Sequence, residues 1–403
     1  MPAFLPPLRL TGAHVLRDGE MQARSVSLAE GRLVEGRLVE GALPEVDLSG
    51  FLILPGIIDL HGDGFEHHMA PRPSANFPLA AGLASFDREA AAQGVTTAYL
   101  AQGWSWEGGH RGPDACETLL AAVQAFRPAA ITDLRVQIRA ETHLVSQTAR
   151  LIDTVQRFGV GYVVFNDHLK EGSQMARNAP AAFAHWARKV GKTPQDLARA
   201  IATARAAQGE VARSLCTLAA AFDTMGVIYG SHDDPDADTR ERFRMLGAVV
   251  AEFPLTEQVA AVARAMASPV IMGAPNVVRG QSQSGNASAC DLVAAGLCQA
   301  LVSDYHVPAL PLAAWALVDR GICNLPQAWA LISTNPAHIL RLADRGRLDP
   351  GRRADLVVID AATRRIEATI CGGRISYLSG EAALRFMAQP RAASGVIGQV
   401  AAE

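Results

Sequence analysis

The chain has 403 residues, of which 49% are hydrophobic, so it can bury one large core and a smaller second one. Its 37 basic and 40 acidic residues give a net charge of −3, which argues against a general binder of nucleic acid or membrane surfaces. The six cysteines are scattered, as expected of reduced thiols in a cytoplasmic protein. We expect no signal peptide, and no apolar run reaches the roughly 18 residues of a membrane-spanning helix.

Short strands are predicted near both ends of the chain, where apolar and polar side chains alternate. The segments with this pattern are 8–10, 14–16 and 25–28 near the start, and 356–359, 366–370 and 374–377 near the end. We predict that residues 1–50 and 345–385 form one composite β-sandwich domain. A poorly ordered tail is expected at 386–403.

Residues 51–344 alternate between apolar runs and segments with helical periodicity. The predicted strands are 51–60, 95–101, 134–140, 162–165, 227–229, 248–253, 270–272 and 300–302. The predicted helices include 80–92, 115–126, 147–158, 196–222, 256–267, 288–295 and 311–319. Eight strands with helices between them favour a (β/α)8 barrel of the TIM type. A doubly wound open sheet is the alternative, but here polar residues follow most strands rather than one switch point.

The first predicted barrel strand ends in a His-x-Asp sequence. Residues 52–60 are mostly apolar, and His61 and Asp63 follow directly. Since residues i and i+2 of a strand point to the same side, both side chains could converge on one metal ion at the barrel mouth. The alternative is an ordinary surface pair.

Other predicted strands also end in residues that can bind metal. Glu141, His168, His232 and Asp304 follow the third, fourth, fifth and eighth strands. Imidazole nitrogens and carboxylate oxygens together suit divalent ions such as Zn²⁺ or Mn²⁺. Each residue alone could instead be hydrogen-bonded, and Asp304 could cap the next helix. Their shared placement at strand ends favours one site on the catalytic face of a barrel.

A Gly/Ser-rich loop after the seventh strand could hold phosphate. It contains Arg279, Ser282, Ser284 and Asn286, which offer a guanidinium, hydroxyls and an amide to an anion. Arg72, between two prolines after the first strand, could add a second guanidinium. An ordinary Gly/Ser loop is the alternative.

The connection from Lys170 to Ala198 is unusually long for a barrel. It is rich in Ala, Arg, Gln and Lys. A lid over the substrate and a solvated helical insertion without a role are both consistent with this composition.

Several motifs resemble those of the amidohydrolase superfamily. They are LPGxxDxH at 54–61, NPA at 335–337, DRG at 344–346 and GxxADLV at 351–357, and they bracket the predicted barrel. Inside it, the chain resembles the PhnM-type family, the ribose 1-methylphosphonate 5-triphosphate diphosphatases of the carbon–phosphorus lyase pathway. The matching pieces are HxD at 61–63, APRP at 70–73, DH at 167–168, SHDD at 231–234, AEFP at 251–254, MGAPN at 272–276, SxSGN at 282–286 and SDY at 303–305.

This resemblance implies metal-assisted hydrolysis of a phosphoanhydride, with release of pyrophosphate from a small anionic metabolite. The implied metal ligands are His61, Asp63, Glu141, His168, His232 and Asp304. One or two divalent ions are expected, with Zn²⁺ preferred over Mn²⁺ or Fe²⁺. Asp304 would accept the proton from water. The implied substrate-binding residues are Arg72, Lys170, Arg279, Ser282, Ser284 and Asn286. A homodimer is a superfamily expectation.

The sequence departs from the family next to these residues. Gly62 replaces a threonine of the HTD motif, Lys170 stands within the former DHxPGQ motif, Gln283 replaces a loop histidine, and His306 replaces a tyrosine. These changes keep the implied ligands and alter their surroundings. An amidohydrolase that cleaves a C–N bond is therefore the main alternative, and a non-catalytic scaffold in a phosphonate-processing complex is a third.

Overall fold

Eight parallel strands form the centre of the molecule. The computed structural model describes residues 4–35, 43–72, 75–282 and 285–388. In neighbouring order the strands are β8 (Ile57–Gly62), β9 (Val95–Trp104), β10 (Asp133–Glu141), β11 (Tyr162–Asn166), β12 (Ile228–His232), β13 (Val250–Glu252), β14 (Val270–Gly273) and β15 (Ala300–Val302). Every neighbouring pair is parallel, so the predicted (β/α)8 architecture is confirmed.

The first and eighth strands meet where their carboxyl ends lie. The backbone N–H of Asp304 donates to the carbonyl of His61 at 3.0 Å, and the N–H of Asp63 donates to the carbonyl of Asp304 at 2.7 Å. Gly62 and Asp304 also form an isolated parallel bridge. The barrel is therefore nearly closed at the mouth where the candidate site residues lie.

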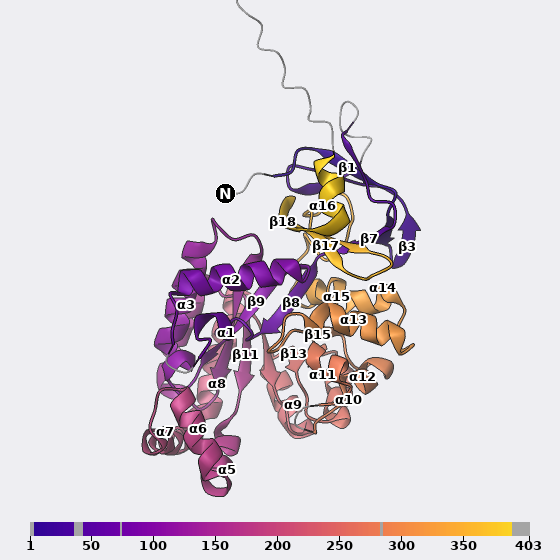
Figure 1. Cartoon of the computed structure of the whole chain (residues 1–403). Coiled ribbons are helices and arrows are strands. Elements are labelled where there is room, and N and C mark those ends of the chain that lie inside the picture. Colours follow the sequence, from indigo (N-terminus) through magenta and orange to yellow (C-terminus); the bar gives the residue numbers. More distant parts are fainter. Residues whose placement is uncertain (1–3, 36–42, 73–74, 283–284, 389–403) are drawn as a thin grey trace, which may run out of the picture.

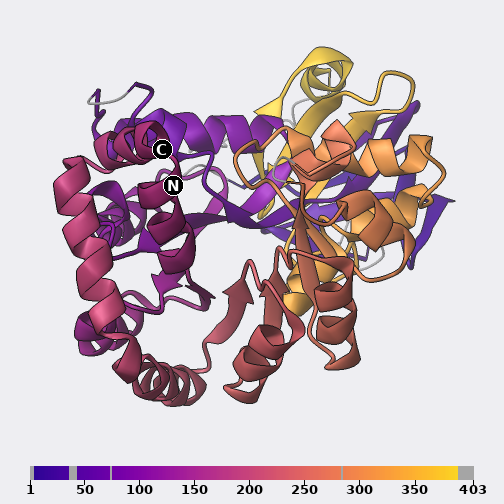
Figure 2. The ribbon, with the colours of Figure 1, turned by 90° about the horizontal axis from the view of Figure 1, so that it is seen from below.

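Helices surround these strands, as Figure 2 shows from below. They include α1 (Glu66–Met69), α2 (Leu79–Ala92), α3 (Pro113–Phe126), α4 (Thr148–Phe158), α8 (Gln208–Met225), α9 (Ala237–Met245), α10 (Glu257–Ala265), α11 (Ala274–Arg279), α12 (Ala289–Ala294), α13 (Ala309–Asp319), α14 (Leu325–Ala330) and α15 (Thr334–Ile339), with 3₁₀ turns η1 (Gly109–Arg111) and η2 (Val145–Gln147). Three more, α5 (Leu169–Asn178), α6 (Pro180–Lys189) and α7 (Pro194–Ala206), belong to an insertion described below. Across the described ranges, none of the helices combines the length and the hydropathy needed to cross a bilayer.

Two further sheets lie beside the barrel, and the larger of them combines strands from both ends of the chain (Figure 1). One has the order β5 (Arg32–Val34), β4 (Val26–Ala29), β1 (Leu8–Thr11), β6 (Glu45–Asp47). The other has the order β18 (Arg374–Leu378), β17 (Ile366–Cys371), β16 (Leu356–Asp360), β7 (Phe51–Pro55), β2 (His14–Arg17), β3 (Glu20–Ala23). Side chains of both sheets share one hydrophobic core, together with Ala382 of helix α16 (Gly380–Met387). Residues 389–403 of the predicted tail and residues 36–42 lie outside the described ranges.

The prediction of one strand over residues 51–60 is wrong, because the chain leaves one sheet for another at Gly56. β7 pairs with β16 of the terminal sheet, whereas β8 pairs with β9 of the barrel. A Cβ on Gly56 would lie 2.3 Å from Oγ1 of Thr96, so the chain passes too close to β9 for any larger residue. An apolar run does not reveal this change of sheet.

The long connection after β11 forms the helices α5, α6 and α7, which lie at the end of the barrel opposite the terminal sheets (Figure 1). These helices have a small hydrophobic core of their own, which includes Phe183, Leu197 and Ile201. The prediction of one helix over 196–222 is wrong, since the helix breaks at Ala207. The break allows α7 to pack in the insertion while α8 packs against the barrel.

A charge network joins the amino end of β10 to the C-terminal segment. Asp133 accepts hydrogen bonds from Arg345 at 2.6 Å and Arg135 at 3.0 Å, and Arg345 also donates to Thr97 at 2.8 Å. Burial alone raises the pKa of Asp133, but Arg135 and Arg345 outweigh burial and lower it to about 2.

We expect Asp133→Asn to lower the free energy of unfolding at pH 7 by about 2–3 kcal/mol. The pKa of Asp133 in the folded protein lies below the usual value of about 3.9. The contribution of Asp133 to the free energy of unfolding is therefore present above about pH 3.9 and is lost as the pH falls towards 2. Chemical unfolding at pH 7 and pH 3 measures both effects. The exposed Asp238→Asn is the control, and an equal loss at both pH values would contradict the assignment.

Candidate active site

Side chains along a strand point alternately inward and outward, and in the barrel this alternation directs several polar side chains towards the mouth. Ile228 of β12 and Val302 at the end of β15 belong to the inner hydrophobic cluster. Residues two or four positions further point to the same side, which places His232 and Asp304 above this cluster. Both line a cavity of about 350 Å³.

His61 reaches the same cavity through an irregularity of β8. The register between β8 and β9 shifts between Asp59 and Gly62. Asp59 is 1% exposed and accepts hydrogen bonds from the backbone N–H of Ser303 at 3.0 Å and from its hydroxyl at 2.6 Å. A Cβ on Gly62 would lie 2.4 Å from Oγ of Ser303, so glycine permits this close approach of the first and eighth strands.

His61, His232 and Glu252 form one candidate metal cluster, with a ligand atom of each lying within 4.8 Å of the others. The imidazole rings of His61 and His232 have centroids 5.2 Å apart. Nδ1 of His61 donates to Oε2 of Glu252 at 2.9 Å, which leaves Nε2 for a ligand. The other carboxylate oxygen of Glu252 accepts from Gln137 at 2.7 Å and from Tyr162 at 2.5 Å.

The donor chemistry of this cluster fits a divalent ion. The side chain of His232 is 7% exposed, yet neither ring nitrogen has a hydrogen-bond partner in the described structure. Oδ2 of Asp233 lies 2.9 Å from Nδ1 without hydrogen-bond geometry. Burial lowers the pKa of His232 despite Asp233, so the imidazole is neutral, as metal ligation requires. A buried imidazole without a hydrogen bond, beside His61, is the arrangement that an ion would satisfy.

Asp304 lies at the same mouth with an unusual backbone conformation. Its φ is 54°, a left-handed value that aspartate and asparagine tolerate better than most residues. Burial raises the pKa of Asp304 to about 6, with His61 opposing and Asp63 adding to the rise. A carboxyl with this pKa can take a proton from water near neutral pH.

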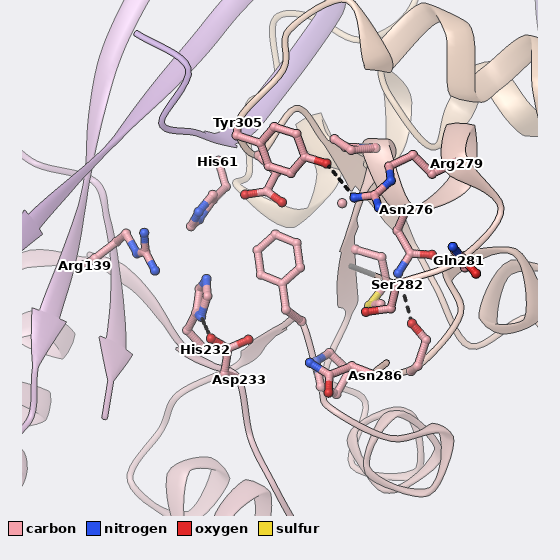
Figure 3. A pocket seen from close by; sticks show the side chains of 17 residues that line it. His61, Arg139, His232, Asp233, Asn276, Arg279, Gln281, Ser282, Asn286 and Tyr305 are labelled. Atoms are coloured by element: carbon pink, nitrogen blue, oxygen red, sulfur yellow. Dashed lines mark hydrogen bonds and ion pairs between the residues drawn. The ribbon is translucent and has the colours of Figure 1, made fainter. Parts of the chain in front are cut away.

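The opposite wall of the cavity is polar (Figure 3). The labelled residues of this wall are Asn276, Arg279, Gln281, Ser282 and Asn286. Arg279, at the end of α11, lies 3.5 Å from the hydroxyl of Tyr305. Asn276 holds the loop in shape, because its amide donates to the carbonyl of Ala287 at 3.1 Å and its oxygen accepts from the N–H of Ala289 at 3.0 Å. The cavity therefore has two imidazoles on one side and a guanidinium with amides on the other.

Two of the predicted ligands lie in a separate group. Glu107, Glu141 and His168 have ligand atoms within 4.8 Å of one another, and none of them lines the larger cavity. His168 is paired with Glu141 through Nδ1, and Trp106 donates to Glu141 at 3.1 Å. Arg139 contributes to the lining of both places.

The structure does not bring every predicted site residue to the cavity. Arg72 and Lys170 are exposed and do not line it. Asp63 is turned towards Arg139, 3.9 Å away, and is not part of either group. Ser284 lies outside the described ranges.

Sequence reasoning missed three residues of the site, of which Glu252 and Glu107 are buried. Glu252 ends β13 and lies within the predicted strand 248–253, so a carboxylate near a strand end was a usable signal. Glu107 was missed because the second strand was ended at residue 101, whereas β9 continues to Trp104. Arg139 lies within the third predicted strand, and its contact with Asp63 could not be read from spacing.

A near-closed (β/α)8 barrel with histidine and carboxylate groups at its mouth is the architecture of a metal-dependent hydrolase. The Amidohydrolase family model matches residues 77–377, and the chain belongs to this family. It is similar to alpha-D-ribose 1-methylphosphonate 5-triphosphate diphosphatase of Escherichia coli (strain K12), with 30% identity over 357 residues, 87% of this chain and 94% of the relative.

Solved structures with the same fold are more distant in sequence. Molinate hydrolase has a TM-score of 0.62 at 13% identity, with 93% of this chain and 95% of that chain covered. Beta-aspartyl dipeptidase from Fervidobacterium islandicum AW-1 has a TM-score of 0.57 at 14% identity, with 93% and 97% covered. These likenesses support the barrel fold.

We expect Glu252→Gln to weaken the binding of Zn²⁺ by about 10–100-fold, because the amide no longer fixes the tautomer and orientation of His61. Equilibrium dialysis of the chelator-treated protein against Zn²⁺ measures this change. Glu257→Gln, on the outer helix α10, provides the matched control. Unchanged Zn²⁺ affinity in a folded Glu252→Gln protein would show that Glu252 does not position a ligand.

Proposed function

We propose that the protein is a metal-dependent diphosphatase that releases pyrophosphate from a ribose 1-phosphonate 5-triphosphate type of substrate during phosphonate breakdown, with Zn²⁺ as its ion. The observation that carries the proposal is the two-sided cavity. The candidate metal cluster of His61 and His232 lies on one side, and Arg279 with polar loop residues lies on the other. The similarity to the curated diphosphatase supports the same substrate class.

His61 and His232 would hold the ion through imidazole nitrogens. A divalent ion there would supply Lewis acidity, which lowers the pKa of water and offsets charge on phosphoryl oxygens. Asp304 accepts a proton as water adds to phosphorus and the anhydride P–O bond breaks. Arg279 binds the phosphoryl oxygens of the departing pyrophosphate. Phe253 packs against His61 and His232, with ring centroids 5.3 and 4.9 Å away, and limits the orientations of both imidazoles.

A second candidate function is hydrolysis of a C–N bond in a small amide or cyclic amide. Among the described residues that line the cavity, Arg139 and Arg279 each carry a guanidinium, and none is a lysine. Two guanidiniums balance only part of the charge of a triphosphate, and Arg72 and Lys170 lie elsewhere. The reaction product separates the two functions, since C–N hydrolysis gives ammonia, an amine or a carboxylate rather than pyrophosphate.

The first test is pyrophosphate release from a ribose 5-triphosphate phosphonate analogue by the purified protein titrated with Zn²⁺ or Mn²⁺. We expect metal-dependent release, reduced by about 10²–10⁴-fold in Asp304→Asn because the proton acceptor is lost. Asparagine is chosen because it tolerates the left-handed backbone at this position.

Asp238→Asn, on the exposed surface of α9, is the control for this substitution. Retained activity in Asp304→Asn would overturn the role of Asp304. No release from the folded, metal-loaded wild-type protein would overturn the diphosphatase proposal, and assays for ammonia and carboxylate release would then test the second function.

Arg279→Ala should lower kcat/KM for the triphosphate by about 10–100-fold, because a charge-assisted hydrogen bond to phosphate contributes roughly 1.5–3 kcal/mol. Most of the effect should appear in KM if Arg279 binds the substrate in its ground state. Steady-state kinetics with Arg88→Ala, an exposed substitution on α2, as the control measure this. An unchanged KM and kcat would place the triphosphate away from Arg279.

A further inference from the structure

Arg139 of β10 lies at the barrel mouth between the two groups of histidines and carboxylates. It lines the larger cavity and also the place next to Glu141. Figure 3 shows its guanidinium on the same side of the cavity as His61 and His232, across from Arg279. We propose that Arg139 is a catalytic residue whose guanidinium binds the oxygen atoms of the phosphoryl group under attack. This role rests on the proposed function and adds the direction in which the substrate lies.

The guanidinium of Arg139 is largely buried and poorly paired. Its side chain is 16% exposed, and its buried Nε has no hydrogen-bond partner among the described residues. Its ion pair is with Asp63, whose Oδ2 is 3.9 Å from Nη1, beyond hydrogen-bond distance. A guanidinium has five N–H donors, and leaving them unsatisfied in a buried place costs free energy. The oxygens of a bound anion would accept several of these hydrogen bonds.

The pattern of β10 explains why the charge of Arg139 is available. Gln137, Arg139 and Glu141 are two residues apart, so their side chains point to the same side of the strand. The two buried carboxylates next to this row already have other partners, because Gln137 donates to Glu252 at 2.7 Å and His168 is paired with Glu141. Within the described ranges, neither carboxylate lies at ion-pair distance from Arg139, which leaves its charge for a ligand.

The two guanidiniums of the cavity fit different parts of the substrate. When the oxygen of water bonds to phosphorus, its proton passes to Asp304, the anhydride P–O bond breaks and the electron pair leaves with pyrophosphate. Negative charge lies on the nonbridging oxygens of the attacked phosphoryl group, and Arg139, on the side of the imidazoles, stabilises that charge. Arg279, on the opposite wall, binds the pyrophosphate.

Inorganic phosphate is the probe for the first test, because it offers the same oxygens without a reaction. Isothermal titration calorimetry of the Zn²⁺-loaded, full-length protein measures its binding, and atomic absorption measures the Zn²⁺ content. We expect Arg139→Gln to weaken phosphate binding by about 10–100-fold and to keep its Zn²⁺, because charge-assisted hydrogen bonds are lost. Arg139→Lys keeps the charge without the planar fork and should lose less. Arg88→Gln, on the exposed surface of α2, should bind phosphate as the wild type does.

Steady-state kinetics of pyrophosphate release provide a second readout. Arg139→Gln should lower kcat by about 10²–10³-fold with little change in KM, which is the reverse of the effect expected for Arg279→Ala. Added guanidinium ion should restore part of the kcat of Arg139→Ala. A residue that only supports the fold would not show this rescue.

Unchanged phosphate affinity in a folded Arg139→Gln protein, or no phosphate binding by the wild type, would overturn this role. Loss of Zn²⁺ together with phosphate would also overturn it, because Arg139 would then support the metal ligands. If Arg139→Gln does not fold, Arg139→Lys decides the question by the same criteria. Weakened phosphate binding in the variant, combined with no pyrophosphate release by the wild type, would overturn the diphosphatase function and leave Arg139 as an oxyanion-binding residue.

Discussion

The mouth of the barrel depends on how closely its first and eighth strands approach each other. Asp59 fixes Ser303 through two hydrogen bonds, and Gly62 has no Cβ to separate the strands. The backbones of His61 and Asp304 can then share hydrogen bonds. This backbone contact brings an imidazole and a carboxyl from opposite ends of a roughly 240-residue segment to the rim of one cavity.

Buried polar groups give the site its second constraint. Glu252 has no exposed surface, and its oxygens accept hydrogen bonds from His61, Gln137 and Tyr162. A fully bonded carboxylate of this kind fixes a ring more firmly than apolar packing would. Arg139 adds positive charge between the two groups of acidic and histidine residues. The electrostatics of the mouth thus come from several strands at once.

Much of the fold could be predicted because each barrel strand is a short apolar run that ends in polar residues. The strand at 300–302 agrees with β15 in both bounds, and three of the residues expected at strand ends, His61, His232 and Asp304, line the cavity at the mouth. The transfer between sheets at Gly56 could not be predicted, because it depends on a contact with Thr96, 40 positions away.

Spacing also could not separate the two groups of candidate ligands. His61, Glu141 and His168 all follow strands, but which side chains share a cavity depends on strand register and on pairs such as Glu141 with His168. Arg72 and Lys170 follow the first and fourth strands, yet the chain carries both to the surface. Loop direction after a strand is set by tertiary packing, which a linear pattern does not contain.

The pairing of β7 with β16 has a consequence for synthesis of the chain. Ile53 and Val358 are direct partners in this sheet although about 300 residues separate them. The N-terminal strands therefore leave the ribosome long before the strand that completes their sheet, and during that interval β7 has one unpaired edge. Closing so long a segment favours slow folding, with the barrel available as an earlier folding unit. A chain without its last 50 residues would still contain every residue of the barrel mouth. The sheet that contains β7 would lack the strands β16, β17 and β18.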